Sequence, residues 1–158
     1  MTDDLKQKFS RRITQANKTE LTVILYEMTI VYVQDAKMAL LSQNIEQYRK
    51  EIKRAKRCME ELLNSLHIEY AIARNIMQLY RYVNRELQKA DVWCTEESLD
   101  HVLLVIQNLH DAYIEISKKD TSDAIMSNTQ SIYAGFTYNK NNLNENLMNN
   151  TANRGFLV

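Results

Sequence analysis

Apolar residues recur at alternating intervals of three and four positions in four segments of this chain, and this spacing constrains the fold most strongly. The segments cover residues 20–41, 45–66, 72–90 and 95–116. In the last three, the repeat runs through Ile45, Tyr48, Ile52, Ala55, Met59, Leu62 and Leu66; through Ile72, Ile76, Leu79, Val83 and Leu87; and through Leu99, Val102, Ile106, Leu109, Tyr113 and Ile116. Such spacing places apolar side chains on one stripe of a helix, where they interlock with a neighbouring helix. We therefore predict four packed helices.

The composition and the connections between the segments favour the same fold. The chain has no proline, and both of its glycines lie beyond the fourth segment, so nothing in the segments interrupts a helix. Asn17 or Thr19 is a candidate N-cap for the first helix, Asn44 for the second and Thr95 for the fourth. The connections are short and polar, which favours antiparallel neighbours. The predicted fold is all-α, an antiparallel up-down four-helix bundle over residues 17–119.

Two segments lie outside the predicted bundle. Residues 1–16 are polar and basic, with Phe9 and Ile13 one helical turn apart, which suits a flexible N-terminal arm that folds back as a loose helix. Residues 120–158 are rich in asparagine and contain both glycines, a composition typical of a flexible tail that is partly ordered at most. This tail also contains the apolar residues Ile132, Tyr133 and Phe136. We interpret the arm and the tail as candidate covers of an apolar groove.

The first helix is more apolar than one helix of a small bundle requires. Between residues 21 and 33, only Thr22, Glu27 and Thr29 are neither apolar nor tyrosine. One stripe of this helix, which we predict to face the bundle core, contains Leu21, Ile24, Met28 and Val31. The apolar residues off that stripe include Val23, Tyr26, Ile30 and Val33, and the fourth helix adds Leu104 and Val105 off its own stripe. Because a second apolar face needs a second partner, we predict that these six residues bind a client protein, or are covered by the chain itself or by a second copy.

Charge and targeting signals exclude several classes of partner. Lys and Arg number 20 and Asp and Glu also number 20, so the chain as a whole does not attract nucleic acid or an anionic membrane. A basic run at residues 49–57 avoids the apolar stripe of its helix and has no interleaved aromatic residues, so we interpret it as a solvated face. The apolar run at 21–33 is too short to span a bilayer, and no secretion signal precedes it. We expect a cytoplasmic protein that neither inserts into a membrane nor binds nucleic acid.

No arrangement of residues in the sequence is typical of an enzyme. None of the three histidines is preceded by glutamate at the spacing that di-iron bundles use, and the helices contain no glycine-rich phosphate loop. Glu97 and His101 lie one turn apart, but we interpret them as polar surface residues rather than as metal ligands. Cys58 lies beside the apolar stripe of its helix and is expected to pack there rather than act as a nucleophile. We predict no catalytic residues, no metal and no cofactor.

Several short motifs occur in an order that resembles one family. They are Glu20-Leu21 with Leu25-Tyr26, then Leu79-Tyr80 with Tyr82, Arg85 and Leu87, then Asp111-Ala112-Tyr113. The stretch IYAGFTYNKNNLNE at residues 132–145 is similar to the tail of some members. Together these motifs resemble the flagellar secretion chaperone that binds flagellin. The resemblance covers residues 17–119 and the start of the tail, and it implies an antiparallel helical bundle.

The resemblance also implies a client and a role. The partner would be the C-terminal segment of flagellin, held in the cytoplasm so that it does not polymerise before export, and other flagellar export or regulatory proteins are possible further partners. It also implies that the N-terminal arm covers part of the client groove when no client is bound, and we expect a monomer or a weak homodimer. The alternative is a structural bundle without a secretion client that forms homo-oligomers through its first helix. A weaker alternative is a bundle that binds RNA or a membrane through residues 49–57.

Overall fold

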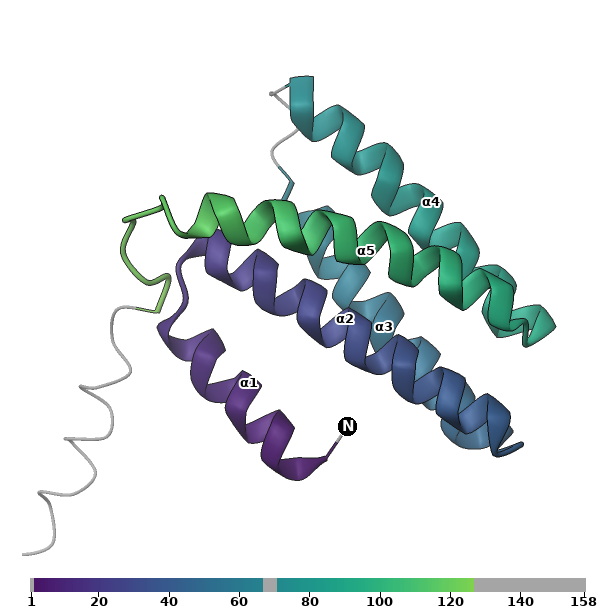
Figure 1. Cartoon of the computed structure of the whole chain (residues 1–158). Coiled ribbons are helices and arrows are strands. Elements are labelled where there is room, and N and C mark those ends of the chain that lie inside the picture. Colours follow the sequence, from purple (N-terminus) through teal and green to yellow (C-terminus); the bar gives the residue numbers. More distant parts are fainter. Residues whose placement is uncertain (1, 67–70, 127–158) are drawn as a thin grey trace, which may run out of the picture. The chain divides into compact units, whose positions relative to one another are not determined.

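The computed structural model describes residues 2–66 and 71–126 of the chain, and all secondary structure in these residues is helical (Figure 1). The helices are α1 (Asp3–Gln15), α2 (Lys18–Leu41), α3 (Ile45–Asn64), α4 (Ala71–Trp93) and α5 (Glu96–Ser117). The predicted all-α class is confirmed for these residues. Ile132, Tyr133 and Phe136 of the predicted tail lie outside them.

Helices α2 to α5 form a closed cycle of contacts. Helix α2 packs against α3 and α5, and α4 packs against the same two helices. Lys37 near the end of α2 forms ion pairs with Glu96 (3.0 Å) and Asp100 (2.5 Å) at the start of α5. Tyr26 near the start of α2 packs edge-on against Tyr113 near the end of α5, with ring centroids 5.4 Å apart. The start of α2 therefore lies beside the end of α5, and the start of α5 lies beside the end of α2.

The core fills the space between these four helices. Its fully or nearly fully buried members include Tyr26, Val33, Ala36, Tyr48, Ile52, Ala55, Met59, Leu62, Tyr80, Val83, Leu87, Ala90, Leu99, Val102 and Ile106. Tyrosine hydroxyls in this core have partners: Tyr26 hydrogen-bonds to Tyr80, and the Tyr48 hydroxyl donates to the carbonyl oxygen of Ala90 at 2.6 Å. Burying a large apolar side chain contributes about 1.5–3 kcal/mol, whereas a buried hydroxyl without a partner would oppose folding.

The helix starts show which predicted caps form. The Asn17 side chain accepts a hydrogen bond from the Glu20 backbone N–H, and the Glu20 carboxylate accepts one from the Asn17 N–H, so α2 begins with a complete capping box. Asn44 caps α3 through the Gln47 N–H at 3.0 Å. Thr95 occupies the N-cap position of α5, but its hydroxyl donates to the Ser98 hydroxyl instead of capping a backbone N–H. Of the two candidates for α2, Asn17 is the cap, and Thr19 lies inside the helix.

The N-terminal arm contains a regular helix, α1, that lies along α2 on the side away from α4 (Figure 1). Phe9, in the middle of α1, is only 5 % exposed. Phe9 packs with Ala16 and Ile24 in a small cluster that is separate from the core of α2–α5. The arm is thus held by its own apolar contacts and adds nothing to the main core.

A carboxylate without a full set of partners is buried between α2 and α3. Glu51 is 0 % exposed, and its Oε1 accepts hydrogen bonds from Gln47 Nε2 (2.5 Å) and Arg54 Nη1 (2.7 Å). Its Oε2 has no hydrogen-bond partner among the described residues. The guanidinium of Arg54 also lies over the ring of Tyr32, 5.8 Å from the centroid. Arg54 therefore neutralises a charge that burial would otherwise make unfavourable.

Replacing Arg54 by alanine is expected to lower the free energy of unfolding by about 3 kcal/mol, because it leaves the Glu51 carboxylate buried without its cation. Urea denaturation followed by circular dichroism measures this change. Arg57→Ala is the matched control, since Arg57 is exposed on the same helix, and such a substitution changes stability by about 0.5 kcal/mol or less. Equal effects of the two substitutions would contradict the structural role given to Arg54.

Candidate functional site

The two apolar faces of α2 have the opposite roles from those that the sequence suggests. Leu21, Ile24, Met28 and Val31, predicted to face the core, pack against α1 together with Phe9 and Ala16. Met28 also touches the main core. We call these four residues the arm-covered face. Ile24 is 2 % exposed beneath the arm. The face that the sequence assigns to the bundle core is thus the one that the arm covers.

Most of the α2 residues that were predicted to point away from the core pack into it. Tyr26 and Val33 are 0 % exposed among α3, α4 and α5, and Ile30 packs partly buried against the same core. The predicted accessibility of Tyr26 and Val33 is therefore wrong. The physical reason is that a helix segment apolar on nearly every side has no polar face from which its orientation can be read. Val23 is buried but belongs to neither cluster; it lines a cavity beside α1.

The other predicted site residues divide between surface and core. Leu104 is 61 % exposed on α5, in agreement with its predicted position off the core stripe. Val105 is partly buried and packs against the main core, as Ile30 does. Phe9 and Ile13 of the arm pack in the cluster that contains Ile24 of α2. On α4, Ile72 and Leu79 are exposed by 69 % and 40 %, because Ala73 and Tyr80 occupy the core positions instead.

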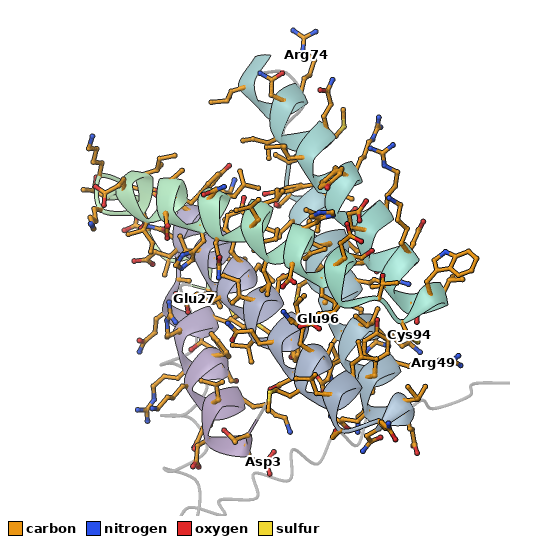
Figure 2. The ribbon with its side chains drawn as sticks, turned by 45° about the vertical axis from the view of Figure 1, so that its right-hand side comes forward. Asp3, Glu27, Arg49, Arg74, Cys94 and Glu96 are labelled. Carbon is orange, nitrogen blue, oxygen red and sulfur yellow. The ribbon has the colours of Figure 1, made fainter. Side chains whose placement is uncertain are left out.

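The arm is also fixed by a polar contact that the sequence analysis missed. Glu27 lies where α1, α2 and α5 meet (Figure 2). Both of its carboxylate oxygens bind the guanidinium of Arg12 on α1, and the Nη2–Oε1 distance is 2.9 Å. His110 Nε2 of α5 is 3.8 Å from Glu27 Oε1. Glu27 is the one charged residue in the apolar run at 21–33, and a charge in such a setting requires a partner. The presence of one carboxylate in an apolar run could therefore have predicted that a cationic side chain faces Glu27.

A cleft that is open to solvent lies beside the arm. It has a volume of about 480 Å³ between α1, α2 and α5, and its lining mixes the polar residues Arg12, Gln15, Glu20, Glu27 and Ser117 with the apolar residues Ala16, Val23, Ile24 and Ile114.

Three further interpretations from the sequence can be compared with the structure. Burial raises the pKa of Cys58 to about 11, so the thiol is packed and protonated near neutral pH. His101 Nδ1 lies 3.5 Å from Glu86 Oε2, and no group of three or more potential ligands in the described residues could hold a metal ion. In the basic run, Arg54 and Lys56 pair with Glu51 and Asp91, while the remaining cations are exposed: Arg49, Lys50, Lys53 and Arg57.

Comparison with known families identifies a match over most of the chain. The model of the family described as flagellar protein FliS matches residues 1–120, a range that includes all five helices. A comparison with curated proteins gave no match. Within residues 2–66 and 71–126, no helix is long and apolar enough to cross a membrane. Since the family model spans most of the sequence, the chain belongs to the flagellar protein FliS family and is a flagellar export chaperone.

Proposed function

We propose that this protein binds the C-terminal segment of flagellin in the cytoplasm, prevents its premature polymerisation and keeps it competent for export. In this proposal residues 17–119 act as an antiparallel four-helix bundle, residues 1–16 as a displaceable arm and residues 120–158 as a tail. The end of α2 contacts the start of α5, and the start of α2 contacts the end of α5, which supports the antiparallel arrangement. The bundle is proposed to act as a monomer or a weak homodimer.

The observation that carries the proposal is the arm-covered face of α2. Its four residues, Leu21, Ile24, Met28 and Val31, form an apolar cluster with α1, and only Met28 also contacts the main core. Removing α1 would therefore expose a continuous apolar surface without opening the α2–α5 core. A wide apolar surface of this kind is typical of protein-binding sites. The client-binding residues we propose are these four and Val23, with Leu104 as an exposed apolar contact on α5.

The client would bind as an amphipathic helix in place of α1. Helix α1 is itself such a helix, since it presents Phe9 and Ile13 to α2 and charged residues to solvent. A disordered client segment that folds onto the surface pays an ordering cost, which burial of apolar area must offset. Calorimetric titration with the C-terminal segment of flagellin from the same organism tests this directly. We expect one-to-one binding with a large negative heat-capacity change, and absence of binding by the folded protein would refute the proposal.

Replacing Phe9 by alanine is expected to tighten flagellin binding, because the arm then competes less well for the face it covers. The gain is roughly tenfold, since burial of one phenylalanine contributes about 1.5–3 kcal/mol and 1.4 kcal/mol corresponds to a factor of ten. The same titration measures it, and Lys8→Ala, at an exposed neighbouring position, is the matched control. Weaker binding by the Phe9 variant would show that α1 contacts the client instead of competing with it.

A further inference from the structure

The chain that follows α5 returns to the start of α2. We call residues 120–126 the strap. Thr19 Oγ1 donates a hydrogen bond to Asp120 Oδ2 at 2.5 Å, and the Ile125 backbone N–H donates to the carbonyl oxygen of Ala16 at 3.0 Å. Asn17 Nδ2 makes two longer contacts, of 3.4 Å, with the carbonyl oxygens of Asp120 and Ser122. These contacts join segments that are more than 100 positions apart in the sequence.

The strap is itself preorganised for these contacts. The Ser122 N–H donates to Asp120 Oδ1 at 3.0 Å, which turns the chain just after α5. Asp120 thus uses one carboxylate oxygen for its own turn and the other for Thr19. These hydrogen bonds, the one from Thr19 first, lower the pKa of Asp120, so the carboxylate is ionised near neutral pH. Ile125, further along the strap, lines a cavity of about 340 Å³ together with Leu21, Leu25 and Tyr113.

Three of these four strap hydrogen bonds fall on the junction between α1 and α2, and the fourth falls on Thr19 in the first turn of α2. Helix α1 ends at Gln15 and α2 begins at Lys18, so Ala16 and Asn17 alone set the direction of α1 relative to α2. Both are buried, with 3 % and 5 % exposure. Ala16 has two contacts that matter here: its side chain packs with Phe9 and Ile24 in the arm cluster, and its carbonyl oxygen accepts the hydrogen bond from Ile125.

We propose that the strap holds the Ala16–Asn17 junction in the conformation that docks α1, so that strap and arm are coupled. With the strap bound, α1 stays on the arm-covered face; when α1 lifts, Ala16 moves and the strap loosens. Such coupling is reciprocal by thermodynamic necessity. An event that pulls on the chain beyond α5 would thereby uncover α2, and a ligand that replaces α1 would release the strap. The inference concerns the free protein and does not depend on the identity of the client.

Hydrogen–deuterium exchange on the full chain tests the coupling in the first direction. Thr19→Val removes the hydroxyl that binds Asp120 and leaves the Asn17 cap of α2 intact. We expect the amides of α1 to exchange roughly tenfold faster, because a hydrogen bond to a charged group contributes about that factor. Thr121→Val is the matched control: it makes the same substitution within the strap at an exposed residue, and should leave the exchange of α1 unchanged.

Phe9→Ala tests the other direction. It weakens arm docking in the middle of α1, and reciprocity then requires faster exchange of the Ile125 amide. Protection of α3 reports whether the bundle stays folded; if Thr19→Val lowers it, Asp120→Asn replaces that variant. The proposal is overturned if Thr19→Val or Asp120→Asn speeds exchange of the strap amides while the amides of α1 still exchange at the wild-type rate. It is equally overturned if Ile125 exchange is unchanged in Phe9→Ala.

Discussion

Replacing Val33 by aspartate is expected to unfold the protein. Val33 of α2 is 0 % exposed and belongs to the main core that α2 forms with α3, α4 and α5. An aspartate there would be an unpaired charge in an apolar interior, at a cost above about 4 kcal/mol, against a typical total stability of about 5–15 kcal/mol. Circular dichroism and urea denaturation measure the outcome. Gln34→Asp, at the exposed neighbouring position, is the control and should unfold at the wild-type urea concentration. A folded Val33→Asp variant would show that the orientation of α2 is wrong.

Replacing Ile24 by aspartate is expected to leave the α2–α5 bundle folded but to weaken binding of the flagellin segment roughly 100-fold. Ile24 is as deeply buried as a core residue, at 2 % exposure, but it packs in the arm cluster with Phe9 and Ala16 and not in the main core. When α1 lifts, water can reach the new charge, so the penalty falls on arm docking and on client binding. The estimate combines the loss of one buried aliphatic side chain, about 1.5–3 kcal/mol, with the cost of desolvating a charge in the complex.

Calorimetric titration measures the binding change, and circular dichroism shows whether the bundle remains. The Gln34→Asp control adds the same charge to the same helix and should bind as the wild type does. Two outcomes would contradict the proposal in different ways. Wild-type affinity in the Ile24 variant would place the client elsewhere, and unfolding would show that the arm-covered face belongs to the core. The comparison with Val33→Asp therefore separates the two apolar faces of one helix.

Helix α3 shows where reasoning from the sequence works well. Its predicted stripe is buried at Tyr48, Ile52, Ala55, Met59 and Leu62, and Asn44 caps it as expected. Apart from Glu51 and Cys58, which are buried, most of its remaining residues are charged or polar. The boundary between apolar and polar faces therefore defines its orientation without reference to other helices. On α5 the same logic holds for Leu99, Val102 and Ile106, which are fully buried.

Helix α2 shows where such reasoning fails. With apolar residues on nearly all sides between positions 21 and 33, spacing alone divides them into two stripes but does not say which stripe faces the core. The larger side chains decide it: Tyr26 reaches Tyr80 and Tyr113, which requires that its stripe face α4 and α5. The excess of apolar residues did indicate that α2 has a second covered face. That second face is the stripe of Leu21, Ile24, Met28 and Val31, which the sequence analysis had assigned to the core.

The helices, most of their boundaries and caps, and the family can be inferred from the sequence, because these depend on residue types and on spacings within a few turns of one chain segment. The packing of the helices was needed to establish which face of α2 the arm covers, that Arg12 and His110 meet at Glu27, and that Thr19 binds Asp120. Each of these contacts joins residues far apart in the chain. Their formation depends on how whole helices pack, and periodicity within one helix contains no information about the partner that will cover it.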